Sequence, residues 1–89
     1  MGIFSSKFIN QIELSPREYY QIKESLDLDF EKTVRKLIPK HGDYPFSIIL
    51  PKTLTKKERH NMYKKTIKGY ITMKSHGEEP HRQMTITVV

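Results

Sequence analysis

The sequence predicts a small α+β domain, with a three-stranded sheet, two helices packed on one face of the sheet and an added N-terminal helix. Helix-start signals precede three segments, and three further segments are rich in strand-forming residues. The resulting order, helix, helix, strand, helix, strand, strand, is typical of a small α+β sandwich. At 89 residues the chain is long enough for one domain with a single thin core.

The first helix is predicted to begin after Ser15. Residues 1–14 contain no strong cap or turn signal, so we expect an N-terminal arm there and a single domain over residues 15–89. Ser15 and Glu18 have the spacing of a capping box, and Pro16 suits the first helical position. Tyr19 and Leu26 recur at helical spacing, so we expect them to pack inward.

A second helix and the first strand are predicted next. Asp27 or Asp29 can cap the helix, and its apolar residues fall at helical spacing on one face as far as Ile38, where Pro39 ends it. A turn cluster at residues 41–43 then precedes residues 44–50, whose short apolar run predicts a buried strand.

The third helix is predicted over residues 56–68 and carries the charge of the chain. Thr55 and Glu58 form a second capping box, and Gly69 is a suitable stop. The segment 52–68 carries a net charge of +6, equal to that of the whole chain, so the flanking segments are neutral. Its cations are Lys52, Lys56, Lys57, Arg59, Lys64, Lys65 and Lys68, against the single acid Glu58.

Two further strands are predicted over residues 70–74 and 82–89. Apolar residues alternate with threonine in the second of them, which predicts one buried face and one more polar face. Residues 75–82 between the strands contain Gly77 and Pro80, which are typical of a turn and a rigid loop. We expect these strands to pair antiparallel, with the helices covering one face.

The composition argues against catalysis and against a membrane span. There is no cysteine, and the histidines do not have the spacing of zinc ligands. The sequence also contains no catalytic Ser-His-Asp order and no phosphate-binding glycine loop. We therefore expect no enzyme activity, no cofactor, no metal and no small-molecule substrate. Since no apolar run of about 18 residues occurs, we expect an intracellular protein. The histidines are His41, His60, His76 and His81.

Residues 26–88 resemble the arginine-three-histidine domain, a small module that binds single-stranded nucleic acids. The similarity includes the apolar segment Phe46-Ser47-Ile48-Ile49-Leu50-Pro51, the pair Glu58-Arg59, the helix ending near Gly69 and Ser75-x-Gly77-x-x-Pro80-x-Arg82. The family fold is a three-stranded sheet with two helices on one side. The resemblance implies a single-stranded RNA or DNA partner and a site on the third helix and the following turn.

The motif that names the family falls on Arg59 and Tyr63, so the expected histidine is replaced by tyrosine. Two interpretations of Tyr63 are open: its ring stacks on a base, or it packs on the sheet with its hydroxyl bonded at the surface. Arg82 likewise contacts phosphate or pairs with Glu78 or Glu79. The full predicted nucleic-acid site is Lys56, Lys57, Arg59, His60, Tyr63, Lys64, Ser75 and Arg82.

Two alternatives involve other partners. Met1-Gly2-Ile3-Phe4-Ser5-Ser6 fits the N-myristoylation pattern at Gly2, and one acyl chain together with the basic helix would form a membrane-surface adaptor. Contact with a membrane is expected only if Gly2 is acylated. In the other alternative, the N-terminal arm and the helix containing Tyr19 and Tyr20 present an apolar surface to a protein partner.

Overall fold

The computed structural model describes residues 9–65, 69–79 and 81–89. In these ranges the chain forms three helices and four strands, in the order β1, α1, α2, β2, α3, β3, β4. Their bounds are β1 Ile9–Glu13, α1 Pro16–Leu28, α2 Phe30–Leu37, β2 Gly42–Ile49, α3 Lys56–Lys64, β3 Ile71–His76 and β4 Gln83–Val88.

The strands form one mixed sheet in the order β1-β2-β4-β3. β2 and β3 both pair antiparallel with β4, whereas β1 pairs parallel with β2. Parallel neighbours need a long crossover, and α1 and α2 supply it between β1 and β2. The register between β1 and β2 shifts after Ile9, which pairs with Gly42, whereas Gln11 pairs with Ser47.

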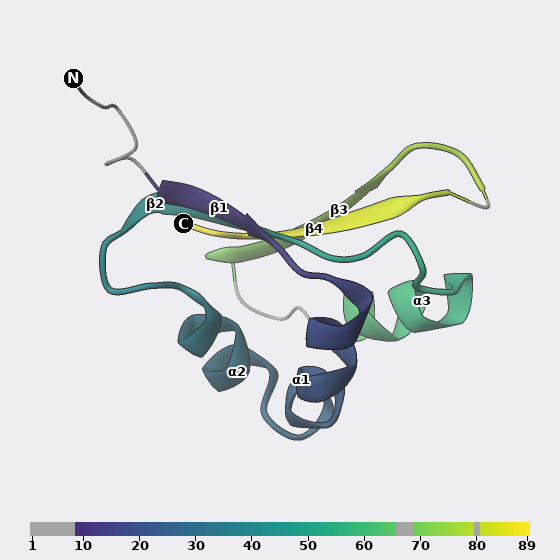
Figure 1. Cartoon of the computed structure of the whole chain (residues 1–89), viewed down its shortest axis with the longest axis horizontal. Coiled ribbons are helices and arrows are strands. Elements are labelled where there is room, and N and C mark those ends of the chain that lie inside the picture. Colours follow the sequence, from purple (N-terminus) through teal and green to yellow (C-terminus); the bar gives the residue numbers. More distant parts are fainter. Residues whose placement is uncertain (1–8, 66–68, 80) are drawn as a thin grey trace.

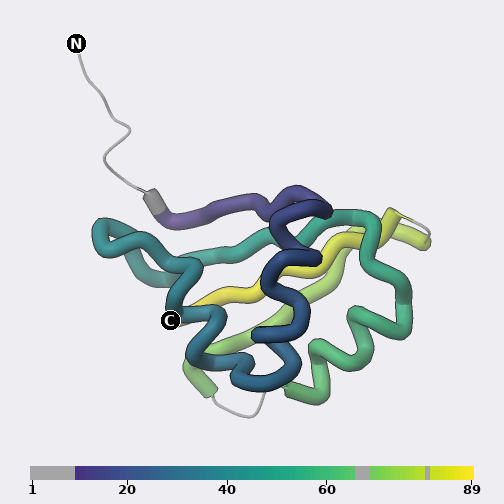
Figure 2. Tube along the Cα trace, turned by 60° about the horizontal axis from the view of Figure 1, so that its bottom comes forward, coloured from purple at the N-terminus to yellow at the C-terminus, as the bar shows by residue number. Residues whose placement is uncertain are grey.

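All of these helices lie on one side of the sheet, so the molecule has two layers (Figures 1 and 2). The strands bury alternate residues on the helix side, as the 2-residue period of a strand requires. The core at the centre of the sheet is formed by Phe46, Ile48, Leu50, Met84, Ile86 and Val88, against which the helices pack Tyr19, Leu26, Val34 and Met62.

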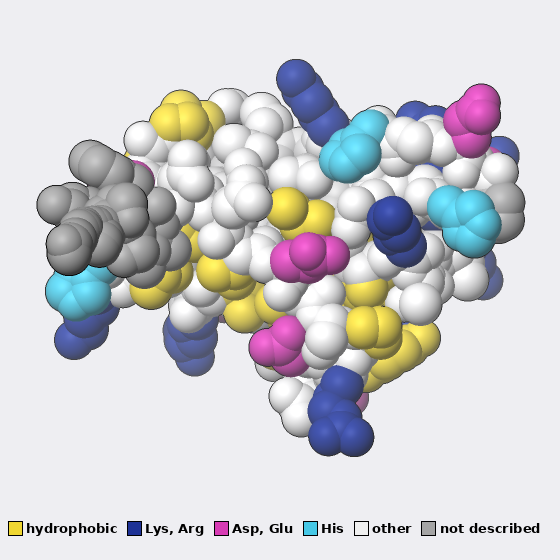
Figure 3. Space-filling model, turned by 45° about the horizontal axis from the view of Figure 1, so that its top comes forward, with side chains coloured by type: hydrophobic (Ala, Val, Ile, Leu, Met, Phe, Trp, Pro, Cys, Tyr) yellow, Lys and Arg dark blue, Asp and Glu magenta, His cyan; other side chains and the backbone are white. Residues whose placement is uncertain are grey.

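In the described part of the chain no helix covers the opposite face of the sheet, on which the registers place the exposed charges of Glu13 and Lys74. Ser47, Thr87 and Thr72 form one row across β2, β4 and β3, and the Ser47 and Thr87 hydroxyls lie 3.4 Å apart. On the face in view in Figure 3, lysine and arginine side chains stand singly and do not gather in one cluster. The strong positive charge of the chain is therefore not concentrated on this side of the sheet.

The predicted helix starts are confirmed. Ser15 accepts a hydrogen bond from the Glu18 backbone N–H at 3.2 Å, and the Glu18 carboxylate accepts from the Ser15 N–H at 2.8 Å. Pro16 is the first residue of α1, and Asp29 caps α2 by accepting from the Lys32 N–H at 3.3 Å. The pKa of Glu18 is lowered, because hydrogen bonds with the Ser15 backbone and side chain favour the charged carboxylate.

The predicted architecture, a three-stranded sheet covered by two helices with an added N-terminal helix, is wrong. The sheet has a further strand, β1, in the segment expected to belong to the arm over residues 1–14. Gln11-Ile12-Glu13-Leu14 does alternate, but four residues are a short signal, and the partner strand lies beyond two helices. Because β1 joins the sheet, α1 is part of the crossover between paired strands and not an addition to a finished fold.

Several boundaries also differ from the predicted ones. β2 begins at Gly42, within the expected turn, and β3 extends to His76. α3 ends at Lys64, and residues 66–68 of its predicted end lie outside the described residues. Pro80 and Gly2 also lie outside them, so the rigid-loop and acylation predictions at these positions have no structural outcome here.

Candidate functional site

The candidate site begins with the way α3 is fixed to the rest of the fold. Its capping box joins Thr55 and Glu58 by hydrogen bonds of 2.9 and 3.1 Å. Glu58 also forms an ion pair of 3.1 Å with Lys23 of α1. Burial opposes ionisation of Glu58, but the Thr55 backbone and Lys23 hydrogen bonds outweigh it, so its pKa is lowered. One carboxylate thus caps α3 and holds the helix against α1.

Arg59 is the buried cation of the site, with 4% of its side chain exposed. One guanidinium nitrogen donates to the Leu54 carbonyl at 2.9 Å, and the other donates to and pairs with the Glu79 carboxylate. A buried charge requires such partners, because its desolvation is costly. Arg59 therefore links α3 to the loop between β3 and β4, and its guanidinium is not free to contact phosphate as the sequence suggested.

Tyr63 makes a second link between the same elements. Its hydroxyl lies 2.8 Å from the Ser75 hydroxyl on β3 and donates to it, while the side chain remains 42% exposed. The bonded hydroxyl agrees with the packing interpretation of Tyr63, whereas stacking of its ring on a base stays a prediction. The hydroxyl is satisfied at the surface, and part of the side chain is open to solvent.

The loop after β3 completes the site. Gly77 adopts a φ of +89°, a conformation that favours glycine, as its predicted turn role requires. Arg82 donates to the Gly77 carbonyl at 3.4 Å. In the described part of the chain Arg82 forms no ion pair, and Glu79, one of its expected partners, pairs with Arg59 instead. The Arg82 charge therefore remains available to a ligand.

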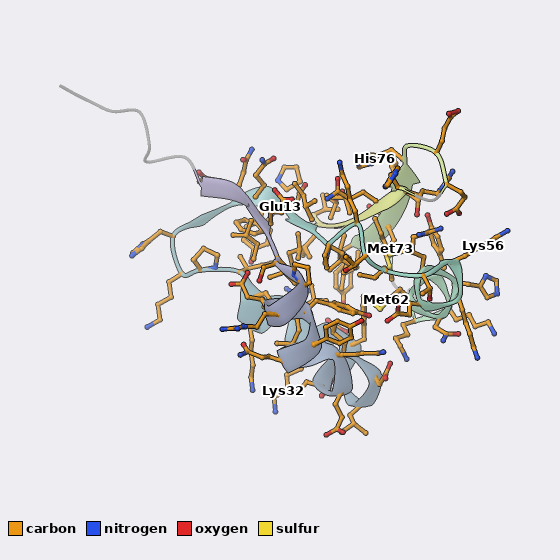
Figure 4. All side chains as sticks on the ribbon, turned by 45° about the vertical axis from the view of Figure 1, so that its right-hand side comes forward. Glu13, Lys32, Lys56, Met62, Met73 and His76 are labelled. Atoms are coloured by element: carbon orange, nitrogen blue, oxygen red, sulfur yellow. The ribbon has the colours of Figure 1, made fainter. Side chains whose placement is uncertain are left out.

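These side chains line a groove of about 380 Å³ between α3 and the β3–β4 loop, here called the α3 groove. Figure 4 shows Lys56 on α3 and His76 at the end of β3 on the same side of the molecule, with Lys32 of α2 projecting elsewhere. The groove contains three cations, one carboxylate, one histidine, one exposed tyrosine ring and one serine. Its lining residues are Lys56, Arg59, His60, Tyr63, Ser75, Glu79 and Arg82.

The α3 groove brings together most of the predicted site residues, with two exceptions. Lys57 instead lines a hollow of about 270 Å³ between α1 and α3, and Lys64 is exposed in the last turn of α3. The hollow between α1 and α3 is also lined by Tyr19, whose pKa is raised to about 12 by burial and by the nearby charges of Glu58 and Asp27. Tyr19 therefore has the packing role that the sequence predicts.

Glu79 is the groove residue that sequence reasoning missed, because it was considered only as a partner for Arg82. No periodicity marks a loop carboxylate as the partner of a helix arginine. The available signal is indirect: an arginine in a basic helix, followed by an acid in the turn of the next hairpin.

The fold and the groove define the chain as a small α+β domain with a cationic surface site. Comparison with protein-family models, with curated proteins and with solved structures finds no significant match. Within the described residues no helix is long and apolar enough to span a bilayer. No group of three or more histidine, aspartate or glutamate side chains in the same residues is arranged to hold a metal ion.

Proposed function

We propose that the chain is a non-catalytic module that binds single-stranded RNA or DNA in the α3 groove. The observation that carries this proposal is the composition of one hollow: the cations Lys56 and Arg82 and the partly exposed Tyr63 line the same groove. Single-strand binders combine cations along the backbone with aromatic side chains on which bases stack. The proposal includes the resemblance to the arginine-three-histidine family, with Tyr63 in the position of the motif histidine, and an intracellular location.

Lys56 and Arg82 are the proposed phosphate contacts. Lys56 is exposed, Arg82 is partly exposed, and neither has an acidic partner within the described residues. Lys56 lies in the first turn of α3, where the helix dipole disfavours a cation and favours a bound anion. A phosphate at this position would lie beside the cation and near the backbone N–H groups of the same turn.

Fluorescence anisotropy with single-stranded and duplex oligonucleotides tests the proposal at about 50 mM and about 200 mM salt. We expect single-strand affinity to fall with salt, because phosphate contacts release counterions. Replacing both Lys56 and Arg82 with alanine should weaken binding and reduce the logarithmic salt slope by about 1.4, at about 0.7 per phosphate contact.

Lys32→Ala with Lys36→Ala is the matched control, since it removes the same charge from exposed positions of α2 outside the groove. This control should retain both affinity and most of the salt slope. A folded wild-type chain that binds no single strand at low salt would exclude the proposed function.

A protein-interaction module is the alternative function, and the exposed apolar residues of α1 favour it. Tyr20 is 59% exposed and Leu28 is 83% exposed. Binding through such residues would change little with salt, in contrast to phosphate binding. A membrane-surface adaptor is a further alternative that requires acylated Gly2, and mass spectrometry of the natively expressed N-terminus tests it.

A further inference from the structure

Glu79 places a negative acceptor inside a groove whose other charges are positive. Its carboxylate is 51% exposed, and its Oε2 atom pairs with buried Arg59. Within the described residues no hydrogen bond engages its second oxygen, Oε1. A ligand in the groove therefore meets both cations and a charged atom that only accepts hydrogen bonds.

The two kinds of charge suit different parts of a nucleotide. Phosphate is repelled by Glu79 and attracted to Lys56 and Arg82, whereas a carboxylate accepts hydrogen bonds from exocyclic amino groups of bases. Adenine, cytosine and guanine carry such a group. Uracil and thymine carry carbonyl oxygens on both sides of their single N–H donor, and these oxygens would face the carboxylate unfavourably.

Arg59 holds the carboxylate in position before any ligand arrives. The guanidinium is itself fixed by the Leu54 carbonyl at 2.9 Å, and its burial leaves it little freedom to move. Preorganised acceptors of this kind distinguish ligands well, because little ordering entropy is lost on binding. The groove volume of about 380 Å³ is in the lower part of the range for small-molecule sites, about 300–1,000 Å³.

We propose that the α3 groove holds one base of a single strand, with the base stacked on Tyr63 and its amino group donating to Glu79. This inference rests on the proposed function and adds a base preference to it. Glu79 is the specificity-determining residue and selects amino-bearing bases over uracil and thymine. Arg59 positions it, while Lys56 and Arg82 contact the neighbouring phosphates.

The sharpest probes are single-stranded deoxycytidine and deoxyuridine oligonucleotides of about twelve nucleotides, which is within the site sizes of single-strand binders. The two bases have closely similar size and stacking surface, but cytosine has an amino group where uracil has a carbonyl oxygen. We expect the wild-type chain to bind the deoxycytidine strand about tenfold more tightly, the low end for a hydrogen bond to a charged group.

Glu79→Gln tests the assignment because the side chain keeps its shape and an oxygen that can accept from Arg59. Its amide also offers a donor, so the preference for deoxycytidine should fall to about twofold or less. Glu78→Gln is the control, since it makes the same charge change at an exposed neighbour that does not line the groove. It should keep the preference.

The outcomes separate this inference from the function on which it rests. Equal, salt-dependent binding of both strands by the wild-type chain overturns base selection and leaves the proposed function standing. A preference that survives in Glu79→Gln overturns the role of Glu79. Absence of binding to either strand by the folded chain overturns the base preference together with the proposed function.

Discussion

Replacing Arg59 with alanine should destabilise the fold, although sequence alone suggests a surface position where the change would have little effect on stability. Arg59 is 4% exposed, donates to Leu54 and pairs with Glu79. Breaking a fully buried ion pair costs about 3–5 kcal/mol, because the remaining charge loses its partner inside the protein. Here Glu79 is half exposed and regains water, which reduces that cost.

We therefore expect Arg59→Ala to lower the free energy of unfolding by about 2–3 kcal/mol, from the lost Leu54 hydrogen bond and the lost packing of the side-chain stem. A domain of 89 residues has a total stability of about 4–13 kcal/mol, so the loss is a large fraction. At about 4–8 °C per kcal/mol, the Tm should fall by about 8–24 °C.

Urea unfolding followed by circular dichroism measures the change, with Lys57→Ala as the control. Lys57 is exposed on the same helix, so its replacement should change stability by less than about 0.5 kcal/mol. If Arg59→Ala also stays within about 0.5 kcal/mol of wild type, then the pair with Glu79 does not anchor the loop, and the reasoning from burial is wrong.

Three other substitutions test separate parts of the structure. Glu58 has a lowered pKa in the folded state, so its stabilising effect is complete above about pH 4.5 and is lost as the pH falls through the folded-state pKa. Urea midpoints measured between about pH 3 and pH 6 should therefore depend less on pH in Glu58→Gln than in the wild-type chain. Tyr63→Phe removes the hydroxyl bonded to Ser75 but keeps the ring, so stability should fall by about 0.5–1.5 kcal/mol while anisotropy reports retained single-strand affinity. Gly77→Ala forces a side chain into a φ of +89° and should lower the urea-derived stability by about 1–2 kcal/mol, whereas an unchanged midpoint would contradict the strained turn.

The helix starts could be predicted from sequence because their signals are local. Ser15 with Glu18 and Thr55 with Glu58 satisfy backbone groups within one turn, and the spacing itself specifies the hydrogen bonds. Pro39 likewise limits α2 through the geometry of the residue before it. These features depend on a few adjacent residues, so no tertiary information is needed to infer them.

Non-local pairings could not be predicted in the same way. β1 is a strand because its backbone pairs with β2, and that partner follows two helices. Arg59 is buried because Glu79 and Leu54 meet it from other parts of the chain, while an arginine in a basic helix is ordinarily exposed. The α3 groove was partly predictable, since most of its residues were expected to lie together. The Glu79 carboxylate in the groove could not be predicted.

The position of β1 in the sheet has a consequence for folding during synthesis. β2 lies between β1 and β4, so one of its neighbours precedes it along the chain and the other follows only after α3 and β3. As the chain leaves the ribosome, β1 can cover one edge of β2 at once, while the edge that β4 will occupy waits for the rest of the domain. Until β4 is synthesised, that edge of β2 has no partner strand, and an unpaired strand edge is where other chains can associate.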